Sequence, residues 1–399
     1  MPPTPFPVMA VLVTAIHGWG RLHSWMRGPD PRGKSAGAHD GLLDSRVRYR
    51  ARTGHLVVRH RGRPNRLMLR IVLMVGAWLA LAGLTPREAF GLDSVTFGTD
   101  WRAQAEHGGF YQALALGYYE QAGLAVSIRE GGPQINHSQL LAAGRLDFGL
   151  ASNSFTALNF VREGIPMVAV AAVFQKDPAI LMAHAGQGND SLAALKGKPI
   201  MIGADTRAGS WQFLKSRFGY TDDQIRPYTF NLAPFLVDPQ AIQQGYLGSE
   251  PFLAAGQGVK PVVLLLADAG YGSYGALIMT SERLIDDRPD IVQRFVTASI
   301  KGWESYLHGD PAPGNALIKQ ANPEMTEALL TYAIDTMKAN GVVESGDAVA
   351  NGIGAMSESR WRSFFEIMAG QGLYPQEMAW QRAFTLQFTG REPGRPAGR

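Results

Sequence analysis

The feature that most constrains the fold is a short-period alternation of strand and helix patterns that begins near residue 95. Runs of β-forming residues alternate with segments in which apolar residues recur at helical spacing. The strand patterns cover 95–98, 124–128, 146–150, 167–173 and 180–183, and the helix patterns cover 108–121, 139–143 and 155–162. This rhythm predicts an α/β fold with mostly parallel strands and helices on both faces of the sheet.

A second set of patterns follows a polar, glycine-rich segment at 186–198, which we interpret as a crossover. Its strands are expected at 199–202, 227–230, 262–266 and 276–280, and its helices at 211–218 and 239–244. The last hundred residues are mainly helical, with patterns over 289–307, 323–339 and 357–370. We therefore expect a discontinuous first lobe of 92–183 plus 275–390, a second lobe of 184–274, and a tail of 391–399. The two crossings between the lobes would act as a hinge.

The positive charge of the chain is concentrated at its beginning. Residues 1–70 carry 12 Arg and 1 Lys against 3 Asp and no Glu, which is a formal charge of +10 in a chain whose total is +4. The remaining residues are therefore net negative. Because the basic charge is not on the part that would fold, we expect no nucleic-acid partner.

Residues 66–91 have the proportions of a secretory signal peptide. An apolar run of fourteen residues, 71–84, follows two arginines, and Ala89–Gly91 supplies a small-x-small cleavage site. A membrane span needs about 20 apolar residues, so this run is too short for a comfortable anchor. We expect cleavage to start the mature chain near Leu92.

Residues 1–65 contain too few large apolar side chains to form a core. We expect this leader to be disordered, or to precede a true translation start at Met68. The sequence contains no cysteine, which excludes disulfides, thiolate metal sites and a cysteine-linked lipid anchor. Export without a lipid anchor predicts a soluble protein of the periplasm.

Polar and aromatic residues follow the first predicted strand, where ligands bind in open α/β sheets. Trp101 can lay its indole flat against a planar ligand, and Asp100 stands beside it. Gln104 and His107 belong to the same stretch, and Gly108 opens the next helix with backbone N–H groups that a polar ligand can approach. A tryptophan packed between two lobes would show the same pattern, so these residues alone leave both interpretations open.

The same stretch reads Trp-x-x-Gln-x-x-His-x-Gly-x-Tyr over 101–111 and resembles the opening motif of the thiamine-pyrimidine (NMT1-like) periplasmic binding proteins. These belong to the nitrate/sulfonate/taurine solute-binding proteins of ABC importers. Matches at 131–134, 147–149 and 164–166 extend the resemblance over about 92–389. It implies a type II periplasmic-binding fold, a small-molecule ligand held between two lobes, an ABC permease as partner, no cofactor, and a monomer.

The resemblance also implies a role for the tryptophan, because in relatives that bind aminopyrimidines it stacks on the ring, and Trp101 matches that position. Such relatives tend to carry a Tyr followed four residues later by a Glu, a spacing that Tyr246 and Glu250 reproduce. A carboxylate can accept from both an exocyclic amine and a ring N–H. The intervening Leu-Gly-Ser is less aromatic than the usual sequence, which leaves the ligand open. Glu250 can also be read as an ordinary acid at a helix start.

Two further helix starts are candidate cleft positions. Ser152 and Asn153 follow a predicted strand, and either can cap the next helix, while the Asn153 amide offers both a donor and an acceptor to a heterocycle. Ser210 lies in the stretch Arg207–Trp211, where free N–H groups of a helix start are either capped or meet a polar ligand edge.

These observations favour a binding protein over an enzyme, with a thiamine-precursor pyrimidine as the favoured ligand. We expect no metal site, since the histidines after the leader show no ligand spacing. One alternative is a sulfonate or nitrate ligand, for which Arg102 and Arg207 are the candidate cations. Another is a pyrimidine-processing enzyme that uses Glu250 with His107. The related eukaryotic synthases depend on a cysteine-rich motif, and a chain without cysteine argues against this reading.

Overall fold

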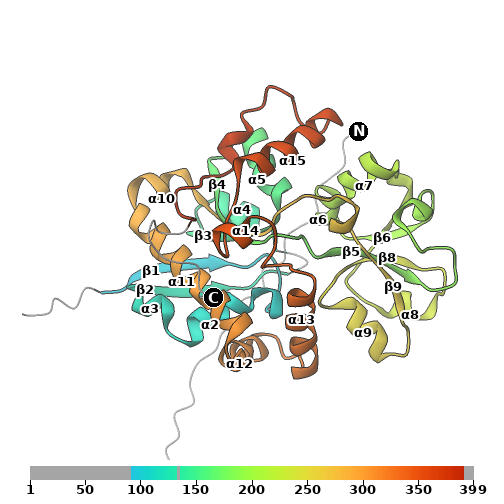
Figure 1. Ribbon diagram of the computed structural model, residues 1–399, viewed down its shortest axis with the longest axis horizontal. Coiled ribbons are helices and arrows are strands. Elements are labelled where there is room, and N and C mark those ends of the chain that lie inside the picture. The colour runs from blue at the N-terminus through green and yellow to red at the C-terminus, as the bar shows by residue number, and fades with distance from the viewer. Residues whose placement is uncertain (1–90, 133–134, 391–399) are drawn as a thin grey trace, which may run out of the picture. The chain divides into compact units, whose positions relative to one another are not determined.

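The computed structural model describes residues 91–132 and 135–390, which belong to one compact unit (Figure 1). The expected leader, the signal peptide up to residue 90 and the tail at 391–399 lie outside the described residues. Within the described ranges, every helix is too short or too polar to cross a membrane.

The first sheet has the strand order β2-β1-β3-β10-β4. Strand β1 pairs in parallel with β2 and β3, whereas β10 runs antiparallel to both β3 and β4. Four of the five strands therefore share one direction, which confirms the predicted α/β class with mostly parallel strands. The strands are β1 (Asp93–Gly98), β2 (Leu124–Arg129), β3 (Phe148–Asn153), β4 (Met167–Phe174) and β10 (Gly275–Ser281).

The second sheet repeats this arrangement with the order β7-β6-β8-β5-β9. Strand β6 pairs in parallel with β7 and β8, and β5 runs antiparallel to β8 and β9. In both sheets the reversed strand thus occupies the fourth position. The strands are β5 (Ala179–His184), β6 (Ile200–Ile202), β7 (Ile225–Pro227), β8 (Ile242–Tyr246) and β9 (Pro261–Leu265).

The chain crosses between the sheets twice. The first crossing lies at 175–178, not near residue 183 as expected, because β5 pairs within the second sheet. The second crossing lies between β9 and β10. The two ends of each excursion are neighbours, since Phe174 is in register with Gly275 and Ile180 with Leu265. The first predicted lobe boundary therefore moves by several residues, and the division into lobes otherwise stays a prediction.

Other expectations also needed correction. The predicted helix over 108–121 is two helices, α2 (Gly108–Ala115) and α3 (Tyr118–Gln121), separated at Gly117, whose φ is +67°. The predicted helix over 239–244 is wrong, because these residues lead into β8 and pair with β5. Local propensity is overridden there by sheet pairing.

Helices of the C-terminal third pack around the first sheet and its helices (Figure 1). Helix α11 (Pro289–His308) packs on α2 through small residues: a Cβ on Gly302 would lie 2.1 Å from the Gly109 carbonyl oxygen. Helix α13 begins at Glu327 rather than 323 because the Thr326 hydroxyl accepts from the Leu329 N–H. The other α-helices of the described residues are α4 (His137–Ala142), α5 (Ser154–Arg162), α6 (Ala204–Arg207), α7 (Ser210–Phe218), α8 (Ala233–Val237), α9 (Glu250–Gly256), α10 (Glu282–Asp287), α12 (Ala312–Ala321), α14 (Gly346–Asn351) and α15 (Glu358–Gly370).

One side chain of α15 holds both crossings. The Arg360 guanidinium donates to the carbonyl oxygen of Gln175 on the first crossing, and to those of Gly272 and Ser273 on the second at 3.1 Å each. It also lies over the Tyr274 ring, 4.1 Å from the centroid. The crossings are thus fixed side by side by one charged group with several partners.

Candidate functional site

The candidate site lies where strands of both sheets end and the two sheets come into contact. Strands β1 and β3 pair in parallel, so their carboxyl ends share one edge; Asp100 and Trp101 follow β1, and Asn153 is the last residue of β3. From the second sheet, Phe230 and Glu250 come from the segments after β7 and β8. Ligands in open α/β sheets bind at such carboxyl ends.

Asp100 is held by two donors. His107 Nε2 lies 3.0 Å from Asp100 Oδ1, and the Ser152 hydroxyl donates to Oδ2 at 2.5 Å. Burial pushes the pKa of Asp100 upward, but these hydrogen bonds and the neighbouring imidazole outweigh it and hold the pKa below its usual range. Ser152 therefore serves Asp100, whereas Asn153 occupies the N-cap position of α5 without a side-chain capping bond.

Trp101 meets an aromatic row that leads to the predicted carboxylate. Its ring lies 4.5 Å from that of Phe230 at an interplanar angle of 52°, and Phe230 lies 5.0 Å from Tyr228. The Tyr228 hydroxyl donates to Glu250 Oε1 at 3.4 Å. Trp101 is thus connected to Glu250 through two intervening rings, and no hydrogen bond joins the two side chains in the described part of the chain.

Glu250 is partly engaged in its own lobe. As the first residue of α9, it turns back so that Oε2 accepts from the Tyr246 N–H at 2.8 Å. Burial raises the pKa of Glu250 above its ordinary value. Burial and the nearby charges of Asp177 and Asp100 also raise the pKa of Tyr246, so its hydroxyl stays neutral. This geometry fits the interpretation of Glu250 as a helix-start acid as well as a ligand acceptor.

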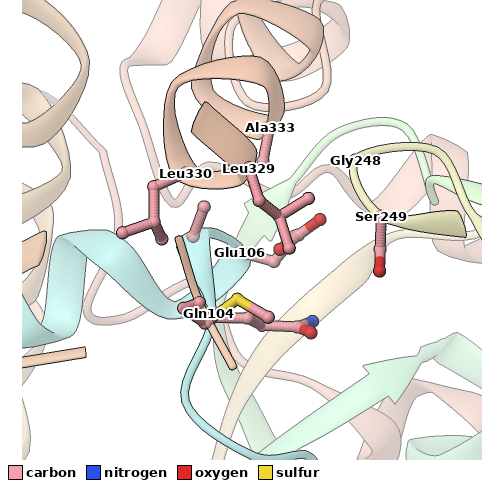
Figure 2. Close-up of a pocket in the computed structure, with 9 residues that line it drawn as sticks. Gln104, Glu106, Gly248, Ser249, Leu329, Leu330 and Ala333 are labelled. Atoms are coloured by element: carbon pink, nitrogen blue, oxygen red, sulfur yellow. The ribbon is translucent and has the colours of Figure 1, made fainter. Parts of the chain in front are cut away.

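Glu106 is a site residue that sequence reasoning missed. Its side chain is buried against Gly248 of the second sheet's β8–α9 turn, where a Cβ would lie 2.3 Å from Glu106 Oε1. Among the described residues Oε1 has no hydrogen-bond partner, and burial raises the pKa of Glu106 to about 7. Figure 2 shows its carboxyl group between α13 and the Gly248–Ser249 turn. The polar stretch around Glu106 predicts an exposed side chain. Its burial follows instead from the close approach of Gly248, which is distant in the sequence.

The pocket in Figure 2 is small. Gln104 lines it together with Glu106 and Ser249, and α13 closes it with Leu329 and neighbouring apolar residues. Its volume is about 10 Å³, room for about one water molecule. In this conformation, the two sheets are therefore tightly apposed at Gln104 and Glu106.

Asn153 and Ser210 lie at helix starts that approach each other. A Cβ on Gly209, the N-cap of α7, would lie 3.1 Å from Asn153 Nδ2, and Ser210 is the buried first residue of that helix. The Asn153 Oδ1 atom is buried without a partner. The structure brings these two helix starts together, while their place in a ligand cleft stays a prediction.

The ionisable groups at this junction are mainly carboxyl groups, and Asp100 is the one whose pKa its neighbours lower. Asp100, Glu106, Asp177 and Glu250 carry carboxyl groups here, and in the described part of the chain none of them pairs with a Lys or Arg. Burial raises the pKa of Asp177 to about 7 as well. The two candidate cations, Arg102 and Arg207, are not buried at this junction. Arg102 is half exposed and 3.6 Å from Glu324, and Arg207 is exposed.

Two mixed α/β sheets joined by two crossings, with ligand-type side chains at their apposed ends, define the periplasmic-binding-protein fold. Comparison with solved structures agrees. The periplasmic aliphatic sulphonate-binding protein SsuA of Escherichia coli superposes with a TM-score of 0.56 at 14% identity, covering 77% of this chain and 96% of that one. At this identity the likeness concerns the fold alone.

The chain belongs to the NMT1/THI5-like family, whose sequence profile matches residues 104–312, more than half of its length. It is 25% identical to the riboflavin-binding protein RibY of Chloroflexus aurantiacus, covering 74% of this chain and 86% of that one. It is 24% identical to a formylaminopyrimidine-binding protein of Halalkalibacterium halodurans (70% and 89%). It is 26% identical to a 4-amino-5-hydroxymethyl-2-methylpyrimidine phosphate synthase of Schizosaccharomyces pombe (57% and 73%). These matches confirm the predicted family resemblance, while the role of Trp101, which precedes the residues matched by the profile, stays a prediction.

Proposed function

We propose that this protein is the solute-binding component of an ABC importer and captures a flat amino-heterocycle, with a thiamine-precursor pyrimidine as the favoured ligand. Family membership supports the class, because two of its relatives are named as binders of riboflavin and of a formylaminopyrimidine. Both of those ligands are planar nitrogen heterocycles with N–H donors. The partners would be this ligand and an inner-membrane permease, with the protein acting as a periplasmic monomer.

The single observation that carries the ligand class is the set of carboxyl groups without cationic partners at the junction of the two sheets. A buried carboxylate oxygen that no donor reaches, such as Oε1 of Glu106 among the described residues, is unfavourable until a ligand supplies one. A ligand with amine and ring N–H groups supplies such donors in a charge-assisted geometry. Asp100, held ionised by His107 and Ser152, is the acceptor best prepared for this role.

Capture would proceed by lobe closure. Trp101 and Asp100 come from the first sheet, and Tyr246 and Glu250 from the second, so a ligand that contacts both sets stabilises the closed form by its differential affinity for it. Gln104, Asn153 and Ser210 would contribute polar contacts at the edges. His107 orients Asp100 and excludes water from it, rather than moving a proton.

An oxyanion ligand is the second candidate in the same class, since the fold is shared with a sulphonate binder. Such a ligand needs cationic or N–H donors. Arg102 and Arg207 are exposed, and the Arg102 guanidinium faces Glu324. Acidic surroundings at the strand ends would repel an anion, which favours the amino-heterocycle.

An enzymatic role is the candidate from a different class, since a synthase is among the relatives. Glu250 and His107 would have to act together. His107 instead pairs with Asp100, and Glu250 with Tyr246 and Tyr228. A Glu250→Gln variant that still binds a pyrimidine but loses turnover would support the enzyme, whereas loss of binding alone supports the carrier.

Native mass spectrometry of protein purified from a periplasmic extract tests the proposal directly, because a retained small molecule identifies itself by mass. A parallel thermal-shift panel uses 4-amino-5-hydroxymethyl-2-methylpyrimidine, a purine, riboflavin and an alkanesulfonate. A true ligand at 100 times its Kd adds about 2.7 kcal/mol of stability. Stabilisation by the sulfonate alone, or by none of the four, would contradict the proposal.

A further inference from the structure

The contact between Trp101 and Phe230 joins two rings that serve no core. Neither residue is part of the three hydrophobic clusters formed by the described residues, and both side chains are only half-buried. Trp101 follows β1 and Phe230 follows β7, so their contact at 4.5 Å links the first sheet to the second. The Trp101–Phe230 contact therefore belongs to the junction between the two sheets and not to the core of either one.

The backbone of Phe230 is strained. Its φ is +60°, and in the described ranges only one other non-glycine residue, Ala276, has a positive φ. For a bulky side chain this conformation is a genuine outlier, of the kind that persists where surrounding structure imposes it. Here the ring is seated in a notch: a Cβ on Gly203 would lie 3.0 Å from Phe230 Cζ, and Tyr228 flanks it at 5.0 Å.

The geometry of the pair leaves no room for a guest on this face of Trp101. Holding a flat ring between two aromatic plates needs parallel planes about 7 Å apart, twice the contact distance of about 3.5 Å between carbon atoms. The Trp101 and Phe230 rings are instead 4.5 Å apart and inclined by 52°. A ligand can stack on this face of the indole only after the Phe230 ring has left.

We propose that Phe230 is a displaceable plug over the Trp101 indole and a specificity-determining residue of the site. For its ligand, the inference rests on the proposed function. A flat heteroaromatic guest restores the stacking that Trp101 loses when Phe230 leaves, whereas an alkanesulfonate or nitrate restores little of it. Displacement also frees Phe230 to leave its strained backbone conformation. The exchange therefore favours aromatic ligands over aliphatic or inorganic ones.

The first test needs no ligand and measures acrylamide quenching of tryptophan fluorescence in the full chain. The described tryptophans other than Trp101 are buried, and a Trp101→Phe variant supplies the background of all remaining indoles. Phe230→Ala and Phe230→Gly should both increase the Trp101 contribution to quenching. The glycine variant accommodates the positive φ, so it separates loss of the ring from backbone strain.

Phe252→Ala is the matched control, because Phe252 of α9 packs on Tyr332 of α13 at 5.0 Å and makes no ring contact with Trp101. Its quenching should equal that of the wild type. Unchanged quenching in both Phe230 variants would overturn the plug, whether or not any ligand is known.

The second test measures affinity for 4-amino-5-hydroxymethyl-2-methylpyrimidine and for riboflavin by calorimetry. Removing a competing aromatic pair should tighten binding about 2- to 12-fold in both Phe230 variants, and Phe252→Ala should bind as the wild type does. Weaker or equal binding in the Phe230 variants would overturn the plug. If the wild type binds none of the probes, the proposed function fails, and the quenching result alone decides on Phe230.

Discussion

Replacing Glu106 with Gln should flatten the pH dependence of the protein's stability. The ordinary pKa of a glutamate is 4.5, and burial against Gly248 and α13 raises that of Glu106 to about 7. Well below pH 4.5 the group is protonated in both folded and unfolded chains, so it leaves stability unchanged. Between pH 4.5 and 7, the unfolded chain releases a proton that the folded chain retains, so stability falls as the pH rises.

Well above pH 7 Glu106 is ionised in the folded chain too, and the free energy of unfolding falls no further on its account. One pKa unit corresponds to about 1.4 kcal/mol, so Glu106 lowers the free energy of unfolding by up to about 3 kcal/mol at pH 8 relative to pH 4.5. Glutamine stays neutral at both pH values and has nearly the same shape. The variant should therefore lose less stability than the wild type over this range, by up to that amount.

Urea denaturation of both proteins at pH 4.5 and pH 8 measures this difference, and every shared titrating group cancels in the comparison. Glu366→Gln, the same substitution on the exposed face of α15, is the matched control and should follow the wild type. If wild type and Glu106→Gln lose the same stability between the two pH values, then Glu106 is not buried as a neutral acid and the reasoning is refuted.

Three further outcomes follow from the packing. Gly302→Ala should destabilise the protein by about 1–3 kcal/mol in urea denaturation, because its Cβ would overlap the Gly109 carbonyl oxygen, whereas Gly370→Ala, with open space around it, should be neutral. Ser152→Ala should lower stability at pH 7 by about 1–3 kcal/mol through loss of a hydrogen bond to ionised Asp100; an unchanged free energy of unfolding in urea denaturation would contradict this. Arg360→Ala should speed limited proteolysis at 175–178 and near Ser273, since three carbonyl oxygens lose their donor; unchanged cleavage would show that α15 does not secure the crossings.

The fold was predictable because its signals are local. The run at 167–173 and the apolar spacing at 289–307 report buried strand and amphipathic helix within a few residues. The segment at 239–244 was mistaken for helix because its strand character comes from pairing with β5, about sixty residues earlier. A pattern within a few residues does not identify a pairing strand that is distant in the sequence.

The candidate site divides in the same way. The positions of Asp100 and Trp101 followed from a general rule about the carboxyl ends of strands. The Phe230 ring on Trp101 and the Gly248 turn on Glu106 are contacts across more than a hundred residues. Phe230 also lay within a predicted strand, whereas pairing ends at Pro227 and the residue instead has a left-handed backbone.

The registers at the two crossings have a consequence for the modularity of the chain. Phe174 and Gly275 face each other on adjacent antiparallel strands, so everything between them occupies the place of a hairpin turn. The second sheet is therefore an insertion between β4 and β10. Its own first and last strands, β5 and β9, lie side by side at Ile180 and Leu265. The insertion therefore leaves the pairing of Phe174 with Gly275 intact, while buried residues of the two sheets share one hydrophobic cluster.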